Sequence, residues 1–316
     1  MQNIILFDFD GTITAHDTIN VLASLATSRN PQTAPLWENI VREYVADHAK
    51  HLKTYRPEAC DRTTLAQELE FLQSLGKVEQ KSVGRVGGLG VFATISGEDF
   101  KAFGEKVVRK HEGDENGKGG TALHEDEPRV DGEAKGEDDG KVMIRKGFGK
   151  FADKVKERGW EFGVVSINWS REFIEGVLSR EGLEGSGSRI KANGIIWPGG
   201  KVEGYEDGNG RKALMTVEDK VRAMRDLVGE IRGGGGEGGG KVVYFGDSPT
   251  DMGCLLEADL GVVVADEDGS KLLETLRRIG LEVPHVKDFT GGERLVWSRD
   301  FEEVLRSAVI ESLEGK

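Results

Sequence analysis

The feature that most constrains the fold of this chain is a short apolar run near its start that ends in acidic residues. The run Ile4-Ile-Leu-Phe7 leads directly into Asp8-Phe-Asp-Gly-Thr-Ile-Thr14. A short, continuous apolar run bounded by a turn signal is typical of a strand buried on both faces, as in the centre of a parallel sheet. Open parallel sheets bind their ligands at the carboxyl ends of the strands. We therefore expect a ligand site around Asp8 and Asp10.

The residues of this turn favour phosphate and metal chemistry. Asp8 and Asp10 are separated by one residue, so one carboxylate can attack a substrate while the other handles the proton. Two like charges this close need a cation, and oxygen ligands with a phosphorylated substrate favour Mg²⁺. Gly11 allows a sharp turn, and Thr12 offers a hydroxyl and an amide to phosphate oxygens. The alternative is a purely structural turn in which the Asp side chains bond nearby amides.

A second apolar run carries acids in the same position relative to its predicted strand. The run Lys241-Val-Val-Tyr-Phe245 is followed by a glycine, by Asp247 and, four residues later, by Asp251. We expect a strand and a glycine turn that place Asp247 at the same edge of the sheet as Asp8. The alternative is that the hydroxyl residues between the two acids only cap the next helix, which leaves Asp247 unexplained.

The order of the predicted elements indicates an α/β protein. Apolar residues at three- and four-residue steps predict helices from Asp17 to about Leu75. Later in the chain, strands and helices alternate, which is typical of a doubly wound parallel sheet. The predicted strands are 161–167, 241–245 and 260–264, and the predicted helices are 147–158, 170–180, 217–231 and 250–257. We expect a Rossmann-like catalytic core formed by residues 1–16 and 143–316 and a smaller helical cap formed by residues 17–111.

The segment between these parts, residues 112–142, has a different composition. Residues 112–140 hold eleven acidic and three basic side chains, a net charge of -8, and almost no large apolar residues. Such a segment cannot offset the conformational entropy of ordering. We predict a disordered, acidic, glycine-rich insertion.

The two acidic motifs together resemble those of the haloacid dehalogenase superfamily. That family has an apolar strand followed by D-x-D-G-T and, later, a strand followed by G-D-S-x-x-D, as this chain does. A helical cap between the first and second motifs is similar to the phosphoserine phosphatase-like branch. The resemblance implies that Asp8 is the nucleophile and Asp10 the general acid and base. It also implies a Mg²⁺ site formed by Asp8, the backbone carbonyl of Asp10 and Asp247, with Asp251 in support.

The two remaining motifs of the family are shorter. Its second motif is a strand ending in Ser or Thr, which Gly163-Val-Val-Ser166 matches, and its third element is a Lys. Ser166 would bond the transferred phosphoryl group, and Lys220 would offset the charge between nucleophile and phosphate. Ser166 could equally satisfy backbone near a helix start, and Lys220 could be a solvated residue with Lys212 in its place. The expected substrate-binding residues are Gly11, Thr12, Ser166, Asn168 and Lys220.

The implied activity is Mg²⁺-dependent hydrolysis of a small phosphomonoester through an aspartyl-phosphate intermediate. A dehalogenase is disfavoured because family members with that chemistry lack the second acid, and Asp10 is present. A phosphotransferase such as a mutase, or a noncatalytic regulatory protein with the same fold, remains an alternative. A cap would exclude bulky partners, so we expect a small phosphorylated metabolite. Candidates for binding a second anionic group, each of which could instead be solvated, are Arg29, Arg42, Arg56 and Arg62.

Charge and composition restrict the other function classes. The net charge of -13 argues against a general affinity for nucleic acid. No apolar run approaches the ~20 residues that a membrane helix needs, and the acidic start does not resemble a signal peptide. Cys60 and Cys254 are isolated, which indicates reduced thiols and no zinc cluster. We expect a cytoplasmic protein without membrane or nucleic-acid partners, and a protein partner stays unknown.

Overall fold

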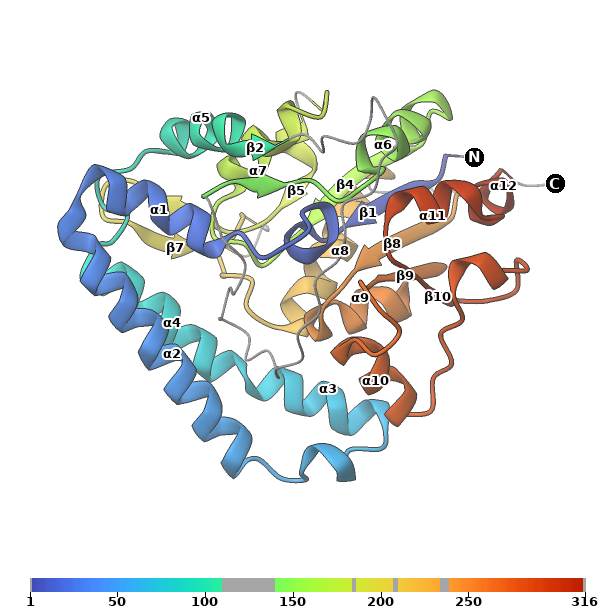
Figure 1. The fold of residues 1–316 in the computed structure, drawn as a ribbon, viewed down its shortest axis with the longest axis horizontal. Helices are drawn as coiled ribbons and strands as arrows, with labels where there is room; N and C mark the ends of the chain where they lie inside the picture. Colours follow the sequence, from blue (N-terminus) through green and yellow to red (C-terminus); the bar gives the residue numbers. More distant parts are fainter. Residues whose placement is uncertain (1, 110–139, 184–185, 207–209, 234–238, 315–316) are drawn as a thin grey trace.

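A parallel sheet forms the centre of the molecule (Figure 1). The computed structural model describes residues 2–109, 140–183, 186–206, 210–233 and 239–314. Within them, a six-stranded sheet has the order β10-β9-β8-β1-β4-β5, and all its pairings are parallel. The strands are β1 (Ile4–Phe7), β4 (Glu161–Val165), β5 (Ile190–Lys191), β8 (Val242–Gly246), β9 (Leu260–Val264) and β10 (Leu295–Ser298). The predicted parallel α/β fold is confirmed.

Helices cover both faces of this sheet, as the alternation of side chains along β1 requires. Ile5 and Phe7 join one apolar cluster, whereas Ile4 and Leu6 join another on the opposite face. The first cluster includes α6 (Phe148–Glu157), α7 (Arg171–Ser179), α11 (Phe301–Arg306) and α12 (Val309–Leu313). The second includes α8 (Val217–Ile231), α9 (Met252–Glu257) and α10 (Lys271–Arg278). The sheet is therefore doubly wound.

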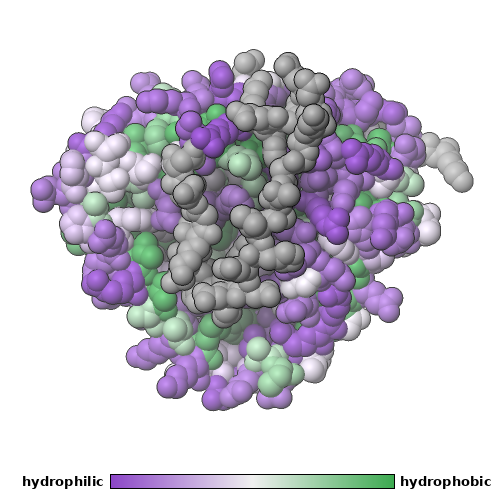
Figure 2. Space-filling view, in the orientation of Figure 1, coloured by the Kyte–Doolittle hydropathy of each residue, from purple (hydrophilic) through white to green (hydrophobic). Residues whose placement is uncertain are grey.

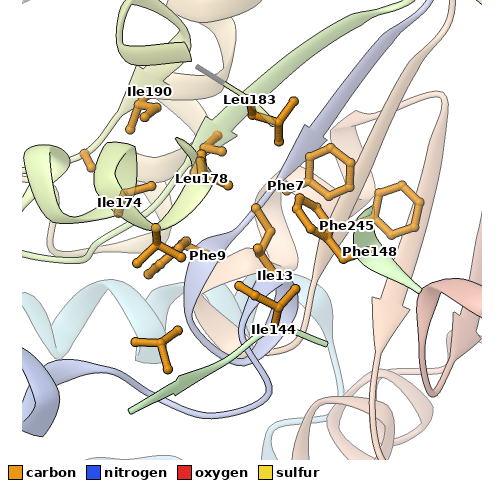
Figure 3. Close-up of a cluster of buried hydrophobic side chains, with 14 of the residues drawn as sticks. Phe7, Phe9, Ile13, Ile144, Phe148, Ile174, Leu178, Leu183, Ile190 and Phe245 are labelled. Atoms are coloured by element: carbon orange, nitrogen blue, oxygen red, sulfur yellow. The ribbon is translucent and has the colours of Figure 1, made fainter. Parts of the chain in front are cut away.

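Aromatic packing fixes the position of β1. The Phe7 ring stacks on Phe245 of the neighbouring β8, with centroids 5.1 Å apart, and meets Phe148 of α6 edge-on at 5.7 Å (Figure 3). Both geometries are favourable for aromatic pairs, and each buried ring removes a large apolar area from water. Because Asp8 follows Phe7 directly, this packing also fixes where Asp8 lies.

The chain between β1 and β4 forms helices, as predicted for residues 17–75. They are α1 (Ile19–Arg29), α2 (Ala34–Thr54), α3 (Leu65–Ser74), α4 (Gly76–Leu89) and α5 (Gly97–Val107). In Figure 1, α2, α3 and α4 extend along one side of the sheet, while α5 lies beside α7. The α5–α7 contact is so close that a Cβ added at Gly104 would collide with the backbone of α7.

Smaller elements flank this helical segment. β2 (Val108–Arg109) pairs in parallel with β3 (Val142–Met143), so Val142, the last residue of the predicted insertion, begins a strand. Gly140 and Lys141 are also described, whereas residues 112–139 of that prediction lie outside the described residues. A short hairpin follows β5, in which β6 (Gly194–Ile196) pairs antiparallel with β7 (Lys201–Glu203).

The surface is mostly polar. In the view of Figure 2, hydrophilic residues cover most of the coloured area, and hydrophobic residues appear in small groups. Among the described residues, no helix combines the length and the apolar character needed to cross a membrane.

Candidate active site

Three acidic side chains meet at the carboxyl ends of the central strands. Asp8 follows β1, and Asp247 follows β8, its neighbour in the sheet. Asp251 ends the short 3-10 turn that follows Asp247. Carboxylate oxygens of the three acids all lie within 4.8 Å of one another. The structure thus brings together acids that come from opposite ends of the chain.

The turn after β1 needs a glycine for two reasons. Gly11 has a φ of 73°, a conformation that residues with a Cβ rarely adopt. A Cβ added there would also collide with the Asp247 carboxylate. The next residue, Thr12, is buried and donates its hydroxyl to Asp247 Oδ1 at 2.7 Å. The turn and the Asp247 carboxylate therefore fix each other's position. The Thr12 hydroxyl, which was expected to bind phosphate, already donates its hydrogen bond to Asp247.

Lys220 is the cation of this site. It lies in the first turn of α8, whose N-terminus is capped by the Thr216 side chain, and it is completely buried. Its Nζ lies 3.0 Å from Asp8 Oδ2 and 2.6 Å from Asp251 Oδ1. The competing candidate, Lys212, is exposed and pairs with Asp219 instead. Only Lys220 of the two is placed among the acids.

Burial and mutual repulsion shift the pKa values of these acids upward. Burial is the largest cause that raises the pKa of Asp8 well above its usual value, and Asp251 adds to it. The same two causes raise the pKa of Asp247 to about 7. Burial alone would lower the pKa of Lys220, but Asp251 and Asp8 outweigh it, so its pKa is raised and the ammonium stays charged. Among the described residues, Lys220 is the one cation that pairs with these acids, so the group carries an excess of negative charge when all three are ionised.

Asp10 is held apart from this acidic group. Its Oδ1 accepts hydrogen bonds from the Thr18 amide (2.8 Å) and hydroxyl (2.6 Å), and its Oδ2 accepts one from Asn168 Nδ2 (2.8 Å). Burial raises the pKa of Asp10, whereas these hydrogen bonds oppose the shift. Asn168, expected to bind substrate, is therefore engaged with the predicted acid and base. Thr18 was missed by the sequence reasoning, and only the fold of the chain at the start of α1 reveals its role.

Ser166 directly follows β4 and is completely buried. Its Oγ accepts a hydrogen bond from the Asn168 amide at 3.1 Å, which leaves the hydroxyl proton for another acceptor. Ser166 and Asn168 thus occupy the carboxyl end of β4, on the other side of β1 from β8.

The donor set fits a hard divalent cation. Asp8 Oδ1 is a buried oxygen without a hydrogen-bond partner among the described residues. Such an atom is costly unless a ligand completes it. Carboxylate oxygens are what Mg²⁺ prefers, and a divalent cation would balance the excess negative charge. The Asp10 carboxylate is not part of the three-acid group, so only its backbone carbonyl remains a candidate ligand.

The arginines considered for a second anionic group have partners within the helical segment. Arg29 pairs with Asp99, Arg56 with Glu58 and Arg62 with Glu68, while Arg42 donates to Asn39. The sequence reasoning also missed Tyr244, whose hydroxyl donates to Asp251 Oδ1 at 2.8 Å. A tyrosine inside an apolar strand carries no signal of such a contact.

Comparison with known proteins gives distant relatives. No protein-family model matches this chain. It is 27% identical over 318 residues to "Cold tolerance protein 1" of Saccharomyces cerevisiae, covering 94% of this chain and 90% of the yeast protein. It is 24% identical over 270 residues to "CTO1 family protein C17G9.12c" of Schizosaccharomyces pombe, covering 82% of this chain and 80% of that protein. Neither printed name states a reaction.

Solved structures are similar to this chain at low sequence identity. A protein of unknown function from Anaerococcus prevotii superposes with a TM-score of 0.50 at 13% identity, covering 94% of this chain and 85% of that chain. A substrate-bound phosphoserine phosphatase has a TM-score of 0.47 at 17% identity, covering 97% of this chain and 98% of that chain.

Proposed function

We propose that this chain, whose acidic motifs resemble those of the haloacid dehalogenase superfamily and whose core is the expected parallel sheet, is a Mg²⁺-dependent phosphatase that forms an aspartyl-phosphate intermediate on Asp8. The observation that carries the proposal is the environment of Asp8. One of its oxygens pairs with the buried Lys220, while the other is buried beside Asp247 and has no hydrogen-bond partner in the part of the chain that the structure describes. A carboxylate prepared in this way can receive a phosphoryl group.

Asp8 and Asp10 divide the chemistry between them. Asp8 attacks phosphorus and the ester P–O bond breaks, while Asp10 gives its proton to the departing alkoxide. Asp10 then takes a proton from the water that attacks the aspartyl phosphate, which releases phosphate and restores Asp8. The raised pKa of Asp10 suits a group that must carry a proton before the first step.

Lys220 and Ser166 stabilise the transferred group. The Lys220 ammonium offsets negative charge as Asp8 approaches the phosphate, and the Ser166 hydroxyl donates to a phosphoryl oxygen. Mg²⁺, when bound by Asp8, Asp247 and the Asp10 carbonyl with Asp251 in support, would neutralise phosphate charge. In this proposal the Gly11–Thr12 turn contributes backbone donors.

We further propose that residues 17–111 act as a cap over a core formed by residues 1–16 and 143–316. The contact that supports this division is Thr18, because the start of α1 bonds directly to Asp10. A cap in this place limits the substrate to a small phosphorylated metabolite.

The test is phosphate release from a panel of small phosphomonoesters, with Mg²⁺ and with chelator. Native protein and Asp153→Asn, a matched change at an exposed acid of α6, should turn over at least one ester only with Mg²⁺. Asp8→Asn should release no phosphate from any ester, with or without Mg²⁺. Folded native protein that binds Mg²⁺ but releases no phosphate from any ester would contradict the proposal and favour a phosphotransferase.

A further inference from the structure

Arg145 is a buried cation outside all four sequence motifs. It lies between β3 and α6, and its side chain is only 9% exposed. One guanidinium nitrogen, Nη2, donates to the Gly11 carbonyl at 2.6 Å. The other, Nη1, donates to Asp266 Oδ1 at 2.8 Å and to the Arg299 carbonyl at 3.0 Å. Arg145 therefore joins the turn after Asp8 to the segments that follow β9 and β10.

The contact with Gly11 fixes the orientation of a peptide in that turn. In a planar trans peptide the carbonyl and the N–H point in opposite directions. The Gly11 carbonyl faces Arg145, so the Thr12 amide points the opposite way. Without a Cβ, Gly11 has little intrinsic preference against rotating this peptide. The hydrogen bond from the Arg145 guanidinium therefore selects one orientation of the Gly11–Thr12 peptide.

Two other polar groups of the turn already have partners. The Gly11 amide donates to Thr14 Oγ1 at 3.3 Å, and the Thr12 hydroxyl donates to Asp247. If the peptide rotated, a carbonyl oxygen would replace an N–H donor in a turn beside three acids. That exchange would weaken the binding of any anion there.

We propose that Arg145 is a positioning residue that holds the Gly11–Thr12 peptide so that the Thr12 amide can donate to the substrate phosphate. This inference rests on the proposed phosphatase function and deepens it by naming what orders the phosphate-binding turn. Arg145 does not touch the substrate and acts only through the turn.

The shape of the guanidinium is part of the argument. Two of its nitrogens bind acceptors on three different segments at once, which a planar fork can do and a single ammonium cannot. Arg145→Lys therefore keeps the charge but loses the bridge, and Arg145→Met loses both. Asp266 is 62% exposed and pairs with Nη1, whereas Gly11 binds Nη2, so Asp266→Asn leaves the Gly11 contact in place.

The experiment measures kcat and KM on the best ester of the panel and, separately, the affinity of the Mg²⁺-loaded protein for inorganic phosphate by calorimetry. We expect kcat to fall ~10-fold in Arg145→Lys and ~100-fold in Arg145→Met, with phosphate affinity falling in the same order. Asp266→Asn should change both by less than ~3-fold. The matched controls are Arg225→Lys and Arg225→Met, because Arg225 is exposed on α8. Both variants should keep the native kcat and the native phosphate affinity.

Two outcomes would overturn the inference. One is a folded Arg145→Lys or Arg145→Met protein with native kcat and native phosphate affinity. The other is a loss of activity explained entirely by a lower folded fraction, with native phosphate affinity in the molecules that remain folded. If the native protein hydrolyses no ester, the proposed function fails, but the phosphate titration still decides whether Arg145 orders the turn.

Discussion

Two buried groups of charged residues differ in how completely their members are satisfied. The Asp8 cluster consists of Asp8, Lys220, Asp247 and Asp251 at the carboxyl ends of β1 and β8. The Glu68 cluster consists of Arg62, Glu68 and Arg278, and it joins α3 and the chain before it to α10. One cluster has three acids and one cation, and the other has one acid and two cations.

The Glu68 cluster is closed by its own residues. Glu68 Oε2 accepts from Arg62 Nε at 2.8 Å and from Arg278 Nη2 at 2.6 Å, and Glu68 is 4% exposed. Arg278 also donates to the Arg62 carbonyl, and the Arg62 guanidinium lies 3.8 Å from the centroid of the Phe71 ring. The Glu68 carboxylate is thus paired with two guanidinium groups, and one of these also packs on an aromatic ring. In the Asp8 cluster, by contrast, Asp8 Oδ1 finds no hydrogen-bond partner within the described ranges of the chain.

The comparison teaches that buried charge can serve two purposes in one protein. A satisfied cluster stabilises the contact between two parts of the chain, and loss of one member leaves the others unpaired. An acidic cluster with an open oxygen costs stability, and binding of a ligand can offset that cost. Arg62, which the sequence analysis gave as a candidate for binding a second anionic group, belongs to the satisfied cluster.

The largest expected effect is on activity. Asp8→Asn removes the nucleophile, so phosphate release should fall ~10³-fold or more. Burial and the nearby Asp251 both disfavour the ionised form of Asp8. The same change removes this carboxylate, so the melting temperature should stay level or rise. Activity assays and thermal unfolding without metal measure both. A marked loss of stability in Asp8→Asn would remove the difference between the clusters.

The same acid-to-amide change should act in the opposite way in the Glu68 cluster. Glu68→Gln leaves Arg62 without its buried partner and should lower the free energy of unfolding by ~3 kcal/mol. Denaturant unfolding measures this, with exposed Glu70→Gln on the same helix as the matched control. The folded fraction should keep its activity. A neutral Glu68→Gln would show that this cluster contributes no stability.

Mg²⁺ should stabilise the protein through the Asp8 cluster alone. At a free concentration 100 times its dissociation constant, it should add ~2.7 kcal/mol to the free energy of unfolding. Native protein and Glu68→Gln should gain equally, because the Glu68 cluster binds no metal. Thermal unfolding with and without chelator measures this stabilisation. Asp247→Asn should be stabilised much less by Mg²⁺ than the native protein. An equal stabilisation of Asp247→Asn would show that the ion binds elsewhere.

The smallest expected effect comes from a partly exposed ion pair between α1 and α5. The hydrogen bond from Arg29, together with those from Ser96, holds the pKa of Asp99 well below its usual value. A lowered pKa contributes stability that is complete above the unfolded pKa of ~3.9 and is lost as the pH falls through the folded pKa. Asp99→Asn should therefore cost ~0.5 kcal/mol at pH 7 and less below pH ~4. A cost that stays constant between these pH values would contradict this account.

The sequence reasoning succeeded where the local pattern and the chemistry coincide. β1, β8, β9 and α8 lie within about one residue of their predicted ranges, because short apolar runs and a capped amphipathic helix carry strong signals. It missed β10, which forms one edge of the sheet, because Leu295-Val-Trp-Ser298 is a run of four residues between the charged Arg294 and Arg299. An edge strand is selected by its neighbour β9, which the local sequence does not contain.

By itself, the sequence determined the type of fold and the acids that belong to the candidate site. Apolar runs that end in Asp8 and Asp247 must bring these carboxylates to one edge if the strands are parallel and adjacent. Only the tertiary structure decided which other groups face them: it placed Lys220 rather than Lys212 among the acids, Thr18 and Asn168 on Asp10, and Arg145 on the Gly11 carbonyl. Strand patterns depend on local periodicity, whereas these contacts join residues far apart in the chain, whose meeting depends on how the whole core packs.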